Sequence, residues 1–110
     1  MALLDDKQIT DGLELLEGWE WRPEDAEIRR TVVMPDFMSV VHLVEAIAHA
    51  AEQAGHHPDM DIRYNRLTLH QTTHAAGGVT EADFALAARM DELIADAQPR
   101  GGSGEGPEGG

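Results

Sequence analysis

The sequence predicts an α+β domain: a four-stranded antiparallel sheet with about three helices packed on one face. Two observations lead to this prediction. Segments with apolar residues at helical spacing alternate along the chain with short segments rich in β-branched residues, in the order helix, two strands, helix, two strands, helix. The strand segments also come in pairs separated by short turns, which is typical of antiparallel hairpins.

The first third of the chain reads as a helix followed by a hairpin. Asp5 and Gln8 have the spacing of a capping box, and Gly18 ends the helical pattern. Residues 19–22 then read as a short strand, and residues 26–34 as a second strand after a Pro-Glu-Asp turn. The apolar positions of this helix are Ile9, Leu13 and Leu16.

The clearest helix begins at Pro35-Asp36 and ends at Gly55. Strands 60–64 and 67–73 follow, with a turn at Asn65-Arg66 between them. The predicted apolar face of the helix consists of Phe37, Val40, Val41, Val44, Ile47, Ala48 and Ala51. We expect Phe37, like Trp19, to belong to the core rather than to stack on a ligand.

The last helix is capped by Thr80, and its apolar side consists of Phe84, Ala87, Ala88, Met90 and Ile94. Residues 1–97 are therefore predicted to form one domain. Residues 98–110 are rich in glycine and contain no large apolar side chain, so we expect a disordered tail. A folded region of this size has a thin core and often gains buried surface by forming a dimer or a tetramer.

Composition excludes several classes of function. The formal net charge of −13 opposes binding to nucleic acid and to anionic membranes. The absence of cysteine excludes disulfides, zinc–thiolate sites, iron–sulfur clusters and thiol nucleophiles. No apolar run reaches the length of a membrane span, and the acidic N-terminus lacks the basic start of a secretory signal, so we expect a cytoplasmic protein.

Three histidines in the middle of the chain form the main candidate for a functional site. His56 and His57 precede Pro58, and His74 follows within nineteen residues of His56. Histidine gives and takes protons near neutral pH, so these three side chains are candidates for acid–base chemistry. An alternative is that one of the adjacent pair only caps the C-terminus of the long helix.

Two carboxylates accompany the histidines. Glu52 lies one turn before His56, where it either orients that ring or is simply solvated. Asp83 has the N3 position of a capping box with Thr80, which favours a structural or supporting role over direct chemistry.

A metal site is not expected. Histidine and glutamate recur along one face of the long helix, but the His-Glu-x-x-His pattern is absent. The members of this face are His42, Glu45, His49, Glu52 and His56. His70 lies on a predicted strand and has no assigned role.

Taken together, these residues resemble the signature of the pterin-4a-carbinolamine dehydratase family. That signature is an acidic residue, three residues, His-His-Pro, an aromatic residue, a Thr-His step and a later Asp. Here it reads Glu52, His56-His57-Pro58, Tyr64, Thr73-His74 and Asp83. The resemblance covers about residues 4 to 97 and implies the same α+β architecture.

The resemblance implies an enzyme that dehydrates 4a-hydroxytetrahydropterin to the quinonoid dihydropterin. It implies that His56, His57 and His74 line one pocket and have catalytic or substrate-binding roles. Glu52 and Asp83 would bind substrate or support the histidines. His74 and one of the pair would be the acid and the base, in an order that the sequence leaves open. No cofactor is implied. The resemblance also implies that the protein serves an aromatic amino acid hydroxylase, which generates the carbinolamine.

The competing interpretation is a protein-binding factor without enzymatic activity. Relatives of this fold act as dimerisation cofactors of a transcription factor or as Rubisco assembly factors. The bacterial assembly factors tend to lose the histidine set, so its retention here favours the enzyme.

Overall fold

The computed structural model describes residues 2–98, and almost all of the predicted tail falls outside these residues. The described chain contains three α-helices, four strands and two 3₁₀ turns. In order they are α1 (Asp6–Leu13), β1 (Glu20–Arg22), η1 (Pro23–Asp25), β2 (Glu27–Val33), α2 (Phe37–Ala54), β3 (Asp59–Arg63), β4 (Arg66–Gln71), η2 (His74–Ala76) and α3 (Glu81–Ala97).

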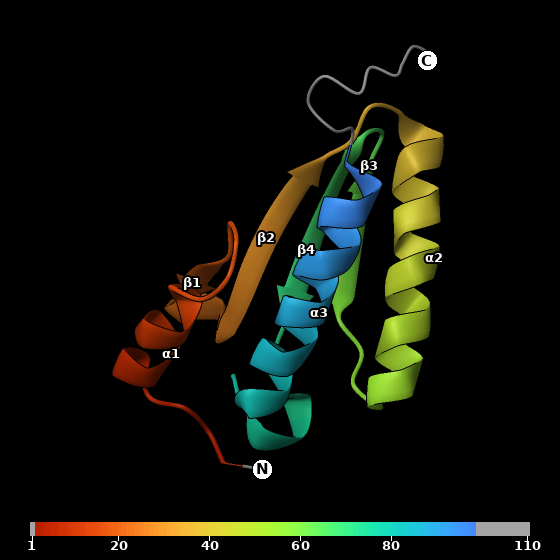
Figure 1. Ribbon diagram of the computed structural model, residues 1–110. Coiled ribbons are helices and arrows are strands. Elements are labelled where there is room, and N and C mark those ends of the chain that lie inside the picture. Colours follow the sequence, from red (N-terminus) through yellow and green to blue (C-terminus); the bar gives the residue numbers. More distant parts are fainter. Residues whose placement is uncertain (1, 99–110) are drawn as a thin grey trace.

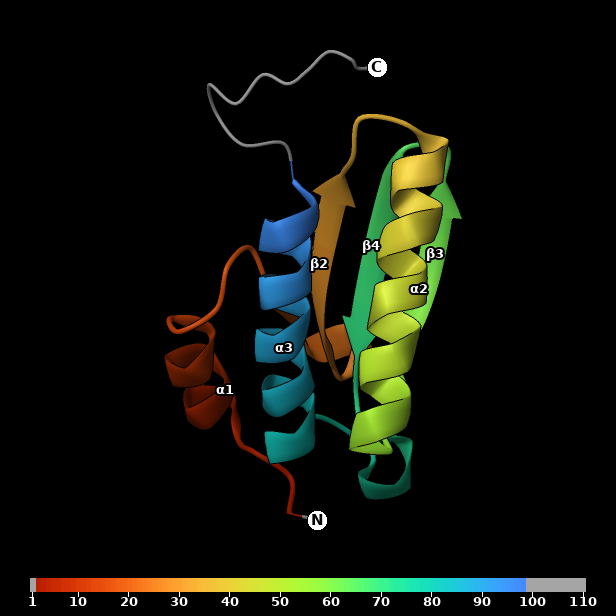
Figure 2. The same cartoon turned by 45° about the vertical axis from the view of Figure 1, so that its right-hand side comes forward.

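The strands form one antiparallel sheet in the order β1-β2-β4-β3. The two hairpins therefore meet at the pairing of β2 with β4, where Ile28 lies opposite Gln71 and Val32 opposite Leu67. Helices α2 and α3 lie side by side on one face of the sheet, and α1 lies beyond α3 near β1 (Figures 1 and 2). The fold predicted from the sequence is confirmed.

The alternation of side chains along the strands determines which face is covered. Apolar residues of β2 and β4 point toward the helices, and the residues between them form an open, polar face. The core on the helix side includes Ile28, Val32, Leu67 and Leu69 from the sheet, Val40, Leu43 and Ile47 from α2, and Leu86, Met90 and Ile94 from α3.

Both predicted capping boxes are present. The carboxylate of Asp5 accepts from the Gln8 amide at 2.8 Å, and the Gln8 side chain accepts from the Asp5 amide at 2.9 Å. Thr80 and Asp83 form the same arrangement at the start of α3. These motifs explain why α1 and α3 begin where the sequence indicates.

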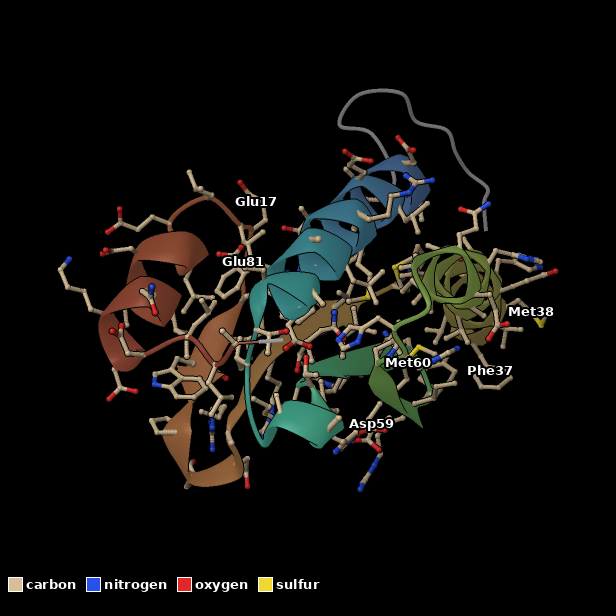
Figure 3. The ribbon with its side chains drawn as sticks, turned by 90° about the horizontal axis from the view of Figure 1, so that it is seen from below. Glu17, Phe37, Met38, Asp59, Met60 and Glu81 are labelled. Atoms are coloured by element: carbon tan, nitrogen blue, oxygen red, sulfur yellow. The ribbon has the colours of Figure 1, made fainter. Side chains whose placement is uncertain are left out.

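The prediction that Phe37 belongs to the core is wrong, because its side chain is 46% exposed. Trp19 lies in the core as predicted. The predicted apolar face of α2 combined two stripes of the helix. The buried stripe passes through Val40, Leu43, Ile47 and Ala50. The second stripe, through Phe37, Val41, Val44 and Ala48, faces away from the centre of the sheet and is exposed or half-buried. Figure 3 shows Phe37 and Met38 on the outer side of α2.

Two boundaries also differ from the prediction. Helix α1 ends at Leu13 instead of continuing to Gly18, because the next amides bond three residues back, as in Leu15 to Gly12 at 3.1 Å. The turn between β3 and β4 lies at Tyr64-Asn65, with Tyr64 in the left-handed region at a φ of 50°.

Candidate functional site

The three predicted histidines line one open cavity of about 410 Å³ at the end of the sheet where α2 ends and α3 begins. His56 and His57 come from the segment after α2, and His74 comes from the segment after β4. The remaining lining residues are Gly55, Thr72, Thr73 and Ala75. The volume lies within the range of small-molecule sites.

Asp83 joins the cap of α3 to the site. Its side chain is fully buried, and its Oδ1 lies 2.6 Å from His56 Nε2. Its Oδ2 accepts from the Thr73 hydroxyl and from the Thr80 amide, both at 2.8 Å. A carboxylate held by these donors cannot rotate freely, so it presents a fixed acceptor to His56.

The contact with Asp83 selects one tautomer of the neutral His56 ring. A neutral imidazole has one N–H donor and one acceptor nitrogen. When Nε2 donates to the carboxylate, Nδ1 is left as the acceptor. A carboxylate that orients a histidine in this way also stabilises the imidazolium that forms when the ring takes a proton.

Glu52 pairs with His57 instead of His56, which corrects the expected pairing. Its Oε2 lies 2.6 Å from His57 Nε2, and both side chains are exposed. The helical spacing from Glu52 to His56 fails because α2 ends at Gly55, whose φ is 65°. There the His56 amide bonds back to the Ala51 carbonyl at 3.2 Å, closing the helix end.

His74 is the most exposed of the three histidines. It begins η2, and its Nε2 lies 3.7 Å from Oδ2 of Asp59, the first residue of β3. Figure 3 shows Asp59 at the same end of the molecule as η2. Sequence reasoning missed Asp59. Its position directly after His-His-Pro was the only indication, and its distance from His74 depends on the pairing of β3 with β4.

The turn after His74 leads directly into the cap of α3. Thr73 and Gly78 form an isolated bridge, in which the Thr73 amide donates to the Gly78 carbonyl at 2.8 Å. Gly77 between them has a φ of 83°, a conformation that favours glycine. This short loop brings Thr73, His74 and Asp83 to one end of the sheet.

Of the histidine and glutamate face of α2, Glu52 contacts the site through His57, whereas its other helical members lie apart from the cavity lining. His49 lies 3.9 Å from Glu45, and both are exposed to solvent. His56 has left the helix and binds Asp83. Within residues 2–98, no group of three or more His, Asp or Glu side chains is placed to hold a metal ion. No helix of these residues is long and apolar enough to cross a membrane.

The fold and the site define a small α+β protein whose clustered histidines are oriented by carboxylates, an arrangement suited to proton transfer. The model for pterin 4 alpha carbinolamine dehydratase matches residues 2–93. Two bacterial proteins with the name "Putative pterin-4-alpha-carbinolamine dehydratase" are similar. The one from Thermomicrobium roseum is 50% identical over 93 residues, covering 84% of this chain and 98% of that protein. The one from Roseiflexus castenholzii is 48% identical with the same coverage. The chain belongs to the pterin-4a-carbinolamine dehydratase family.

Solved structures agree on the fold. The transcriptional coactivator/pterin dehydratase from Brucella melitensis superimposes with a TM-score of 0.79 at 30% identity, covering 83% of this chain and 97% of that one. A pterin dehydratase-like protein, described as a RuBisCO assembly factor in the alpha-carboxysome, has a TM-score of 0.60 at 20% identity. It covers 71% of this chain and 90% of its own, and at that identity the likeness concerns the fold alone.

Proposed function

We propose that this protein is a hydro-lyase that removes water from 4a-hydroxytetrahydropterin and releases the quinonoid dihydropterin. The observation that carries the proposal is one cavity lined by His56, His57 and His74 in a chain of the dehydratase family. Each of these rings lies near a carboxylate: His56 and His57 lie 2.6 Å from Asp83 and Glu52, and His74 lies 3.7 Å from Asp59.

The reaction needs one acid and one base. The hydroxyl on the ring-fusion carbon leaves as water after it receives a proton, and the adjacent ring nitrogen loses a proton as the carbon–nitrogen double bond forms. His74 and one of the adjacent pair supply these two roles. Atoms and electrons balance without a cofactor, because nothing is oxidised or reduced. Glu52 and Asp83 support the rings, and Asp83 does so from a fully buried position.

Removal of either of two histidines tests the proposal. We expect His56→Ala and His74→Ala each to lower the dehydration rate by about two to four orders of magnitude, as loss of a positioned acid or base does. The measurement is stopped-flow turnover of a chemically prepared 4a-carbinolamine. His49→Ala is the matched control, because His49 is exposed, lies 3.9 Å from Glu45 and does not line the cavity. Rates within threefold of wild type for both site variants would reject the assigned roles.

The proposed reaction also indicates where its substrate comes from. A carbinolamine of this kind is produced by an aromatic amino acid hydroxylase, so we place the protein beside such an enzyme in the cytoplasm.

We also propose that the protein is a homo-oligomer, a dimer or a tetramer. The exposed side chains of Phe37, Met38, Ile62 and Tyr64 support this, because they form apolar surface near the open edge strand β3.

A protein-binding function without catalysis is the second candidate. It is suggested by the structural relatives, which include a protein described as a RuBisCO assembly factor. Two experiments separate the candidates. Turnover by the purified protein supports the dehydratase, whereas inactivity together with stoichiometric co-purification of a second protein supports the binding factor.

A further inference from the structure

A second cluster of histidine and carboxylates lies on the open face of the sheet, outside the cavity. His70 on β4 has its Nδ1 2.5 Å from Glu27 Oε2 on β2 and its Nε2 2.7 Å from Asp61 Oδ2 on β3. The side chains of His70 and Glu27 are only 16% and 12% exposed. One ring therefore connects three neighbouring strands.

Both nitrogens of this ring face acceptors. A neutral imidazole would direct a lone pair at one of the two carboxylates, whereas an imidazolium donates to both. The geometry is therefore satisfied only by the charged ring. In the folded protein, burial acts to lower the pKa of His70, but the hydrogen bonds and charges of Glu27 and Asp61 outweigh burial and raise the pKa above its ordinary value.

The surrounding charges support the same state. Arg29 is the cross-strand neighbour of His70 on β2, and it donates to Glu27 and to Asp25, both at 2.9 Å. Asp59 is the neighbour of His70 on β3. Arg22 on β1 is the cross-strand neighbour of Glu27 and pairs with Glu20 and Glu24. Carboxylates therefore outnumber cations around His70. Loss of the proton from His70 would remove the charged partner of Asp61 on β4.

The cluster adjoins the candidate site through β3. This strand is at the edge of the sheet and pairs only with β4. Asp61 and Asp59 lie two residues apart and on the same face of β3, and the carboxylate of Asp59 lies 3.7 Å from His74 Nε2. The contact between His70 and Asp61 thus fixes the part of β3 from which Asp59 reaches the cavity.

We propose that His70 is a positioning residue: as an imidazolium it fastens the edge strand β3 to the centre of the sheet and keeps Asp59 next to His74. The positioning of β3 and Asp59 by His70 is inferred from the contacts alone. The effect of this positioning on catalysis rests on the proposed function, so the decisive measurements do not use turnover.

The first measurement is the protonation of His70 in the wild-type protein by long-range ¹H–¹⁵N NMR near pH 7.5. An ordinary histidine, with a pKa of about 6.5, is mostly neutral there. We expect both ring nitrogens of His70 to carry protons. Signals of a neutral tautomer would overturn the proposal.

The second measurement compares His70→Gln and Asp61→Asn with the wild type. We expect hydrogen exchange of the β3 amides bonded to β4 to become roughly tenfold faster, the effect of losing one charge-assisted hydrogen bond. We also expect the ring resonances of His74 to move in both variants and in Asp59→Asn. His49→Gln is the matched control and should change neither. Unchanged exchange in β3, or unchanged His74 resonances, would show that His70 positions nothing.

Turnover then separates this proposal from the proposed function. If the wild type is a dehydratase, His70→Gln should lower kcat several-fold with little change in KM, since the cavity wall itself is intact. If the wild type shows no turnover but the NMR results are as expected, the dehydratase fails and the positioning of β3 stands.

Discussion

Replacement of Asp83 by asparagine is the sharpest test of how the site works. The amide oxygen of asparagine can still accept from Thr73 and Thr80, which bind Oδ2 in the wild type. The amide nitrogen then takes the place of Oδ1 and faces His56 Nε2. Because that nitrogen is a donor, Nε2 must accept and the ring proton moves to Nδ1.

The two consequences differ in size. The cap survives in altered form, so we expect a loss of about 1–2 kcal/mol in the free energy of unfolding. The nitrogen of His56 that should accept a proton becomes a donor, and the charge that stabilised the imidazolium is gone. We therefore expect kcat to fall by roughly 100-fold or more, as for a histidine held in the wrong tautomer.

Stopped-flow turnover and urea denaturation measure the two effects on the same sample. Asp91→Asn is the matched control. Asp91 also lies on α3 and also accepts three hydrogen bonds: from the Trp19 indole and Arg30, both at 2.7 Å, and from the Glu17 amide at 2.9 Å. It should lose stability but keep its turnover. Wild-type turnover in a folded Asp83→Asn protein would refute the orienting role of Asp83.

Three further predictions concern stability and assembly. Gln71→Leu should change the free energy of unfolding by less than about 1 kcal/mol, measured by urea denaturation. It removes a buried Oε1 that has no partner among the described residues, and this gain offsets loss of the bond from Gln71 Nε2 to the Asp83 carbonyl at 3.1 Å. The pKa of His70 is raised in the folded protein, so charged His70 contributes its full stabilisation below about pH 6.5 and loses it as the pH rises through the folded pKa. The difference in free energy of unfolding between wild type and His70→Gln should therefore shrink at alkaline pH, and a constant difference would contradict this prediction. Light scattering should show a dimer or a tetramer that tightens as salt screens the net charge of −13, and a mass near 12.0 kDa throughout would exclude it.

Local patterns predicted the fold well, because its main determinants act over a few residues. Capping boxes at Asp5 and Thr80 set the starts of α1 and α3. Gly55 set the end of α2. The error at Phe37 has a physical reason: a helix with two apolar stripes has no single direction of burial, and periodicity alone cannot say which stripe meets the sheet. Only the position of β3 and β4 beneath α2 decides it.

The pairing of histidines with carboxylates was harder to predict, because it depends on contacts between distant segments. Glu27 reaches His70 through the register of β2 against β4, which alternation of side chains fixes only to within two residues. Asp59 reaches His74 through the register of β3 against β4. Neither register can be obtained from residue types. The sequence analysis therefore missed both carboxylates and left His70 without a role, whereas it did identify His74.

Asp83 shows how a local motif and a distant contact can combine. The capping box fixes its carboxylate through Thr80, three residues away, before any tertiary contact is needed. The tertiary fold then has only to bring the end of α2 against the start of α3, and His56 meets an acceptor whose direction is already set. The sequence indicated a structural or supporting role for Asp83, and in the structure its carboxylate contacts both the helix cap and His56. The same carboxylate that starts α3 also selects the tautomer of His56, so one side chain sets both the cap of that helix and the ring nitrogen of His56 that is left as an acceptor.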